Sequence, residues 1–236
     1  MIINDYIDEI SKCCELNILL GVSGLVMLTW GNISILSKDK KYVFIKPSGV
    51  PFKDLCVDNI SIVTAESGVH VYGLKPSVDT PIHLSLYNAD PSLKSICHNH
   101  SHFATVWAQS GKDLPLLGTT HADYFPDKIP NIPIADSNSI MSYEKSIGIC
   151  VSRYLKTTMY GAAELGAVLL RSHGPLVFSN TIDDILEKSI VLEEVASLAF
   201  HTQIIAEKST YNLDSKRLFK FHYDRKHGKE KYYGQD

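Results

Sequence analysis

The order of strand-like and helix-like segments constrains the fold of this chain more than any other feature. Short segments rich in β-branched residues and bounded by turns predict strands at 32–36, 42–45, 60–64, 69–73 and 95–100. Residues 167–178 predict two further strands, broken at 173–175. Longer segments predict helices at 5–20, 77–90, 102–110, 142–157 and 181–207. Because the two kinds of segment do not alternate strictly, the pattern favours a mixed sheet with helical layers.

Composition narrows the class of protein. The 236 residues fit one large domain or two small ones, and no linker argues for two. Hydrophobic residues make up 44% of the chain, enough to bury a sizeable core. The net charge of −3 gives no electrostatic footprint for nucleic acid. The basic stretch 224–236 is interrupted by acidic residues and is best interpreted as a solvated face.

Cysteine usage and the N-terminus indicate the compartment. The five cysteines are scattered and odd in number, which suits free thiols in a reducing environment. The first residues carry acidic side chains where a signal peptide needs positive charge. Residues 17–32 are apolar, but too short and too interrupted by glycine to span a bilayer. We therefore expect a cytoplasmic protein without a membrane partner.

Three histidines, at 98, 100 and 102, follow an apolar stretch. In a strand, side chains at i and i+2 point the same way, so His98 and His100 can converge on one point. Two imidazoles at the end of a strand commonly provide two of the ligands of a transition-metal site. His102 would leave that face if Ser101 caps a helix, and we expect it at the surface or behind the ligands. Taken alone, the pair is equally compatible with hydrogen-bonded structural histidines.

Further ligands must come from elsewhere, because a catalytic zinc usually has three or four protein ligands. Asp79 is one candidate, at the start of the predicted helix before the histidine strand. His173 is another, in a turn at a strand end. Each could equally be an ordinary helix-terminal carboxylate or loop histidine. Together with His98 and His100 they form a plausible set of one carboxylate and three imidazoles.

Two turns suggest a phosphorylated ligand. Residues 30–34 (WGNIS) and 46–50 (KPSGV) combine glycine turns with Asn, Lys and Ser, which can donate hydrogen bonds to phosphate oxygens. Neither turn matches a nucleotide-binding fingerprint, so each alone is best interpreted as an ordinary turn. Ser77 adds a donor two residues from Asp79. This spacing favours a phosphorylated substrate that lies across a metal.

The chain resembles the class II aldolase and epimerase (adducin-head) family. The similarity extends from residue 28 to residue 235, in the order of the family, and its stretches are LTWGNIS, KPSGV, KPSVDTPIH, HNHSHFATVWAQSG, GTTHADYFPDKIP, SHGPLVF, IVLEEVA and HYDRKHGKEKYYGQ. GTTHADYF and the YYGQ tail are specific to the epimerase branch. The resemblance implies an α/β fold, a three-layer α/β/α sandwich around a mixed, mostly antiparallel sheet. It also implies one domain over 1–236, a tail from about 211 that contributes to the active site, and homotetramers with interfacial sites.

The resemblance also implies the roles of site residues. The ligands of one divalent metal per subunit, zinc in the first place, would be Asp79, His98, His100 and His173. The substrate phosphate would be held by Asn32, Lys46, Ser48, Gly49 and Ser77. Asp123 and Tyr233 would form the acid/base pair on opposite faces of the substrate, and His222 matches a further active-site histidine.

The implied activity is inversion of C4 of L-ribulose 5-phosphate, which gives D-xylulose 5-phosphate. The C4 hydrogen is not adjacent to the carbonyl and cannot readily be abstracted, so the C3–C4 bond is expected to break and re-form around glycolaldehyde phosphate. A metal on the C2 carbonyl and C3 hydroxyl would act as a Lewis acid. Re-addition to the opposite face requires two acid/base groups. We expect Tyr233 to act in trans, on a site whose metal and Asp123 belong to the adjacent chain.

Departures from the family pattern leave alternatives open. Val78 replaces a usual serine, and His102-Phe103 replaces the usual Arg-His, so the affinity for substrate is in question. One alternative is an aldolase of the L-fuculose 1-phosphate type, although those enzymes usually carry Glu at the position of Asp79. Others are a methylthioribulose-phosphate dehydratase and a non-catalytic adducin-head-like module, which would be expected to lose metal ligands. Arabinose and ascorbate catabolism are both compatible with the sequence.

Overall fold

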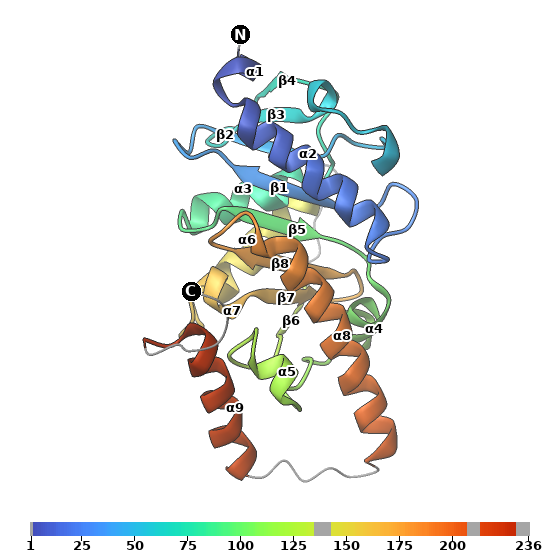
Figure 1. Ribbon diagram of the computed structural model, residues 1–236, viewed down its shortest axis with the longest axis vertical. Helices are drawn as coiled ribbons and strands as arrows, with labels where there is room; N and C mark the ends of the chain where they lie inside the picture. Colours follow the sequence, from blue (N-terminus) through green and yellow to red (C-terminus); the bar gives the residue numbers. More distant parts are fainter. Residues whose placement is uncertain (1, 135–142, 207–212, 230–236) are drawn as a thin grey trace.

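The computed structural model describes residues 2–134, 143–206 and 213–229. Its centre is an eight-stranded sheet in the order β4-β3-β2-β1-β5-β8-β7-β6 (Figure 1). The strands are β1 (Asn32–Leu36), β2 (Tyr42–Ile45), β3 (Ser61–Thr64), β4 (His70–Tyr72), β5 (Ser95–His98), β6 (Asn131–Ile132), β7 (Ala167–Leu170) and β8 (Pro175–Ser179). Neighbouring strands run antiparallel, apart from the parallel pair β6–β7. The predicted mixed, mostly antiparallel sheet is therefore confirmed.

Helices cover both faces of this sheet. One face carries α2 (Ile7–Val22), α4 (His102–Ser110) and α8 (Asp184–Ile205), while the other carries α3 (Thr80–Ala89), α6 (Tyr143–Leu155) and α7 (Ala162–Leu165). Three more helices, α1 (Ile2–Asp5), α5 (Thr119–Ala122) and α9 (Leu213–His227), lie at the ends or edge of the sheet. The 3-10 turns Phe52–Asp54 and Val57–Asn59 contact α2. This arrangement confirms the three-layer α/β/α sandwich.

Side chains alternate between the two faces of the sheet along each strand, and this produces two layers of hydrophobic core. On β1, Ile33 and Ile35 belong to the core layer of α2 and α8, whereas Leu36 belongs to the core layer of α3. Side chains at i and i+2 share a face of the sheet, so a strand with apolar residues at successive positions is buried on both sides. All five residues of β1 are buried. The central strands thus form a rigid support whose ends can present polar side chains.

Most predicted elements are present, with shifted ends. The segment 167–178 divides into β7 and β8 at the predicted break, and Gly111 ends α4 in the left-handed conformation (φ 71°). Strand β5 ends at His98, so the prediction that it continues to residue 100 is wrong. The short elements α5, α7 and β6 and the charged helix α9 were not predicted, and α9 occupies part of the stretch expected to be a solvated face. Within the described ranges, no helix has both the length and the apolarity to cross a membrane.

Candidate active site

A cavity of about 550 Å³ opens where β1 begins and β5 ends. Antiparallel pairing places Asn32 at the start of β1 opposite His98 at the end of β5, and Leu176 of β8 pairs with His98 on the other side. The walls are formed by residues 29–32, 46–49, 77–79 and 143–144 together with His98, His100 and His173. Segments far apart in the sequence therefore meet at one end of the central strands.

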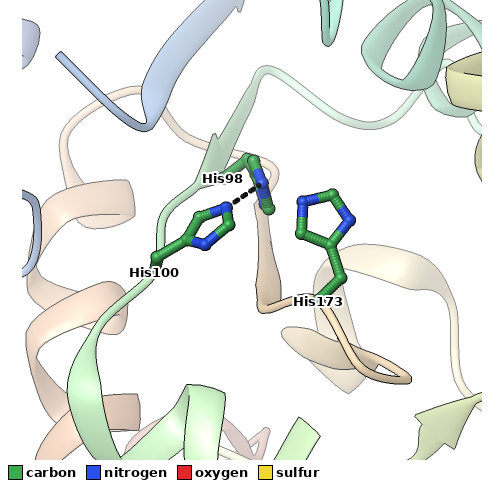
Figure 2. Close-up of side chains that lie close together, drawn as sticks. All are labelled: His98, His100 and His173. Atoms are coloured by element: carbon green, nitrogen blue, oxygen red, sulfur yellow. Dashed lines mark hydrogen bonds between the residues drawn. The ribbon is translucent and has the colours of Figure 1, made fainter. Parts of the chain in front are cut away.

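Three histidines form the floor of this cavity. His98, His100 and His173 each offer a ring nitrogen, and these three atoms lie within 4.8 Å of one another. Figure 2 shows the three rings turned toward a common point. The Nε2 atoms of His98 and His100 are 3.2 Å apart. Two ligands of one tetrahedral zinc ion, with bonds of about 2.0–2.1 Å, are separated by about 3.3 Å, so this spacing fits a shared metal ion.

The orientation and protonation of the rings also suit metal binding. The Nδ1–H of His98 donates to the carbonyl of Pro175 at 2.9 Å, which leaves Nε2 free for a metal. The Nδ1 of His173 is buried and has no hydrogen-bond partner among the described residues. Burial, aided by the neighbouring imidazoles, lowers the pKa of His100 and of His173 to about 4. Both rings are therefore neutral near pH 7, which is the form that coordinates metals.

The backbone around His98 explains how His100 reaches the same point although it lies beyond the strand. After β5 the chain turns, and Asn99 Oδ1 accepts a hydrogen bond from the Ser101 amide at 3.0 Å. Two glycines allow other segments to approach this turn. A Cβ on Gly31 (φ +88°) would lie 2.9 Å from the His98 carbonyl oxygen, and one on Gly174 would lie 2.7 Å from that of Asn99. The convergence depends on this close packing, and the i, i+2 rule of a strand does not account for it.

Glu193 of α8 fixes the start of α4, directly after the histidine turn. Its Oε1 accepts from the amide of Phe103 at 2.8 Å and its Oε2 from the amide of Ala104 at 3.0 Å. Ser101 occupies the predicted N-cap position, but its side chain makes no capping bond, so that part of the prediction is wrong. A carboxylate here also complements the helix dipole. His102, one residue on, is exposed, in agreement with the expectation that it lies at the surface.

Asp79 lines the same cavity but lies outside the group of three histidines. Its Oδ2 accepts from Asn32 Nδ2 at 2.7 Å and from Ser77 Oγ at 3.4 Å. Burial alone would raise the pKa of Asp79, but His98, His83 and the bond from Asn32 outweigh it and lower the pKa. The carboxylate is therefore ionised beside the histidines, and its role as a fourth ligand stays a prediction.

The opposite wall of the cavity suits an anion. The amide of Ser48 donates to the carbonyl of Lys75 at 2.9 Å, which places 46–49 beside 75–77. The buried Lys46 ammonium donates to Thr29 O at 3.1 Å and Pro47 O at 3.3 Å, and burial lowers its pKa to about 8 despite the opposing effect of Asp79. Gly49 adopts a positive φ of 71°, which favours glycine.

Not every predicted phosphate ligand is free to donate. The amide hydrogens of Asn32 go to Asp79 and, at 3.2 Å, to Ser77 Oγ, so the atom left without a partner in the described part of the chain is the acceptor Oδ1. The hydrogen bonds therefore assign Asn32 to the support of Asp79, and its contact with phosphate stays a prediction. Val78 is 58% exposed and contributes an apolar side chain to the same wall.

Two cavity residues carried no signal in the sequence. Tyr143 and Glu144 begin α6 and line the cavity. The Tyr143 ring stacks on His173, with centroids 6.4 Å apart and an interplanar angle of 20°. Residues at the start of a predicted helix belong to no fingerprint, so only the tertiary structure could place them.

Asp123 lies away from the cavity, between α5 and α9. Its carboxylate accepts from Arg225 Nη2 at 2.9 Å and is 3.0 Å from His222 Nδ1, while His227 contacts its carbonyl oxygen at 2.9 Å. The structure thus brings the predicted Asp123 and His222 together but does not bring them to the histidines of the same chain. Tyr233 lies outside the described residues.

The depressed histidine pKa values predict acid sensitivity of the metal-free protein. A histidine in the unfolded chain has its ordinary pKa of 6.5, whereas the pKa of His100 and of His173 in the folded chain is about 4. Between these values the unfolded state binds more protons, so the free energy of unfolding falls as the pH falls from about 6.5 to about 4. Thermal melting across this range measures the effect. A melting temperature independent of pH would contradict it.

Comparisons with known proteins agree with these features. Residues 11–200 match the model of the family described as class II aldolase and adducin N-terminal domain. A protein of Mycoplasma pneumoniae named probable L-ribulose-5-phosphate 4-epimerase UlaF is 38% identical, over 99% of this chain and 96% of its own length. L-ribulose-5-phosphate 4-epimerase UlaF of Salmonella paratyphi C is 37% identical, over 90% of this chain and 92% of its own.

Solved structures share the fold. A structure of L-fuculose 1-phosphate aldolase superposes with a TM-score of 0.75 at 21% identity, over 91% of this chain and 95% of its own. YgbL of Escherichia coli, described as a putative aldolase/epimerase/decarboxylase, superposes with a TM-score of 0.72 at 22% identity, over 89% and 97% of the two chains. At such identities the likeness extends to the fold alone.

Proposed function

Because the chain belongs to the class II aldolase and adducin N-terminal domain family, we propose that it is a zinc-dependent L-ribulose-5-phosphate 4-epimerase that forms D-xylulose 5-phosphate. The observation that carries this proposal is one cavity with a three-histidine group on its floor and an anion-binding wall beside it. Such a site could serve more than one reaction. The relatives at 37–38% identity are named L-ribulose-5-phosphate 4-epimerases, which favours 4-epimerisation. Either arabinose or ascorbate breakdown could supply this substrate.

His98, His100 and His173 would hold the cation, with Asp79 as a fourth ligand. The neutral rings of His100 and His173 and the 3.2 Å spacing of the Nε2 atoms of His98 and His100 fit a divalent ion. Such an ion acts as a Lewis acid toward the carbonyl oxygen of the substrate. Imidazole and carboxylate ligands suit zinc, while other divalent metals remain acceptable to the same donor set.

The anion-binding wall would hold the phosphate of the substrate. Lys46 supplies the positive charge, and Ser48, Gly49 and Ser77 line the cavity within the two adjoining loops. A phosphate fixed there positions C4 and keeps glycolaldehyde phosphate in the cavity after the C3–C4 bond breaks. The aldehyde can then rotate and present its other face for re-addition. Retention of this fragment distinguishes an epimerase from an aldolase, which releases its product.

Inversion requires one group that accepts the proton of the C4 hydroxyl and another that returns a proton on the opposite face. We assign these roles to Asp123 and Tyr233, with His222 bonded to the Asp123 carboxylate. The sequence leads us to expect Asp123 in the same chain as the metal. Because Asp123 does not line the cavity of its own chain, we propose instead that it acts in the cavity of a neighbouring subunit. The active form would then be a homotetramer of single-domain chains in the cytoplasm, with the tail from about residue 211 contributing to interfacial sites.

The phosphate site gives a quantitative prediction. Charge-assisted hydrogen bonds contribute roughly 1.5–3 kcal/mol each, so Lys46→Ala or Ser48→Ala should raise KM about ten- to a hundredfold with metal content unchanged. Because the pKa of Lys46 is about 8, substrate binding by the wild type should also weaken as the pH rises through this value. Steady-state kinetics measure both effects. Equal turnover of non-phosphorylated L-ribulose would refute the assignment.

The proposed activity is tested with purified protein that has been stripped and reloaded with Zn²⁺. Incubation with L-ribulose 5-phosphate should produce D-xylulose 5-phosphate, detected by a coupled assay. The same protein should not cleave L-fuculose 1-phosphate to free products. Cleavage of the second substrate, without epimerisation of the first, would identify the protein as an aldolase instead. Activity toward neither, with metal bound, would favour a non-catalytic module.

A further inference from the structure

A line of polar contacts joins β1 to α3 directly behind the cavity. Asp79 at the N-cap of α3 and His83 and Tyr87 within α3 follow one another at intervals of four residues, so they share one side of the helix. Asn32 and Ser34 are two residues apart on β1 and face that helix. The contacts pair Asn32 with Asp79 at 2.7 Å, and Ser34 with both His83 at 2.7 Å and Tyr87 at 2.8 Å. Only the first of these pairs lines the cavity.

His83 is an unusual occupant of this position. Its side chain is fully buried, with an exposed fraction of 0%. Its Nδ1 is bonded to Ser34 Oγ, whereas its Nε2 is buried and has no partner among the residues that the structure describes. Leucine or methionine would fill the same space without leaving a polar atom unpaired, and buried polar atoms are almost always hydrogen-bonded. Packing alone therefore does not account for a histidine here.

The side chain of His83 lies in the neighbourhood of Asp79. His83 follows Asp79 by one helical turn, and the two side chains are close enough that each influences the pKa of the other. Burial lowers the pKa of His83 to about 3, so its ring is neutral and carries one hydrogen at physiological pH. Asn32, which donates to Asp79, holds another buried atom without a partner among the described residues, its Oδ1.

The hydroxyl network can determine which nitrogen carries that hydrogen. The Tyr87 hydroxyl is within hydrogen-bond distance of Ser34 Oγ, and Ser34 Oγ is within that distance of His83 Nδ1. The Tyr87 hydroxyl has one hydrogen, which can go to Ser34 Oγ or to the Ser34 carbonyl oxygen 3.1 Å away. When Tyr87 donates to Ser34 Oγ and Ser34 Oγ donates to His83, Nδ1 is an acceptor and the hydrogen resides on Nε2. The buried nitrogen is then a donor, and the ionised carboxylate of Asp79 is the acceptor of matching charge.

We propose that His83 is a positioning residue of the cation site, whose Nε2–H donates to the Asp79 carboxylate when a cation is bound and so fixes that carboxylate beside the three histidines. The inference rests on the cation site of the proposed function but not on the identity of the sugar phosphate. Partners of this kind, one layer behind the ligands, contribute about ten- to a hundredfold to metal affinity.

Two variants distinguish the roles of the two ring nitrogens of His83. In His83→Asn the side-chain amide can replace Nδ1, whereas in His83→Gln it can replace Nε2. The affinity of the metal-free protein for Zn²⁺, measured by competition with a chromophoric chelator, should fall about ten- to a hundredfold in His83→Asn and stay within about threefold of wild type in His83→Gln. Thermal unfolding of the metal-free variants serves as the control for folding. A purely structural histidine would lower both melting temperatures and leave both affinities unchanged, which would overturn the proposal.

A measurement on the wild type avoids dependence on folding of the variants. Nitrogen-15 NMR of histidine-labelled protein reports which ring nitrogen carries the hydrogen. His83 should be the Nε2–H tautomer in the zinc-loaded protein, and an Nδ1–H tautomer would overturn the assignment. Neither readout requires turnover. Zinc binding that depends on His83 in a protein without epimerase activity would therefore refute the proposed function while leaving this inference intact.

Discussion

Replacement of His98 or His173 by alanine is expected to abolish stoichiometric metal binding and essentially all turnover while the chain remains folded. Each variant removes one of three converging ring nitrogens, and the two that remain are a poor site for a divalent ion. The fold should survive because these side chains lie at strand ends, outside the two large clusters of buried hydrophobic residues that form the layers of the core. Metal content by elemental analysis, activity and circular dichroism provide the three readouts.

His102→Ala is the matched control for this experiment. It removes an imidazole from the same short stretch, but His102 is exposed at the start of α4 and does not belong to the converging group. Metal content and turnover should stay within about twofold of wild type, as for most surface substitutions. If the loss equalled that of His98→Ala, the assignment of ligands within residues 98–102 would be wrong.

Asp123→Asn is expected to slow epimerisation by about a hundredfold or more with metal content unchanged. A positioned acid/base group contributes about 10²–10⁴-fold, and asparagine keeps the shape of the side chain but cannot accept the proton. Asparagine also keeps one acceptor for Arg225, so the packing of α5 against α9 should persist. Turnover within about threefold of wild type would remove Asp123 from the mechanism.

Subunit exchange tests where Asp123 acts. A mixture of Asp123→Asn and His98→Ala proteins should regain activity, because some sites would combine intact histidines of one chain with an intact Asp123 of another. Random exchange in a closed ring of four would restore up to about a quarter of the sites. Failure to recover, with exchange proven by mass spectrometry, would place Asp123 in the cavity of its own chain.

The sheet and its layers could be predicted from the sequence because their signal is local. Ile33 and Ile35 alternate with Ser34 on β1, and the break at His173-Gly174-Pro175 lies in a run of apolar residues. Short elements such as α5 and β6 are stabilised by tertiary contacts, so their sequences carry no comparable pattern.

The sequence predicts which residues form the site better than it predicts the backbone geometry that brings them together. The sequence predicts His98, His100 and His173 from their residue types and positions, and the structure brings their ring nitrogens together, while their role as metal ligands stays a prediction. The turn that carries His100, however, depends on contacts with Gly31 and Gly174, which no periodicity encodes. Contacts between distant helices, such as that of Glu193 with α4, were equally inaccessible, because sequence spacing cannot locate partners some ninety residues apart.

Epimerisation in deuterium oxide tests the central claim most directly. Zinc-loaded protein is incubated with L-ribulose 5-phosphate in D₂O, and the D-xylulose 5-phosphate formed is analysed by proton NMR. Cleavage and re-formation of the C3–C4 bond never ionises the C4–H bond, so we predict a product that retains protium at C4. Incorporation of deuterium at C4 would show that the carbon is deprotonated instead, and the absence of D-xylulose 5-phosphate would contradict the proposed function itself.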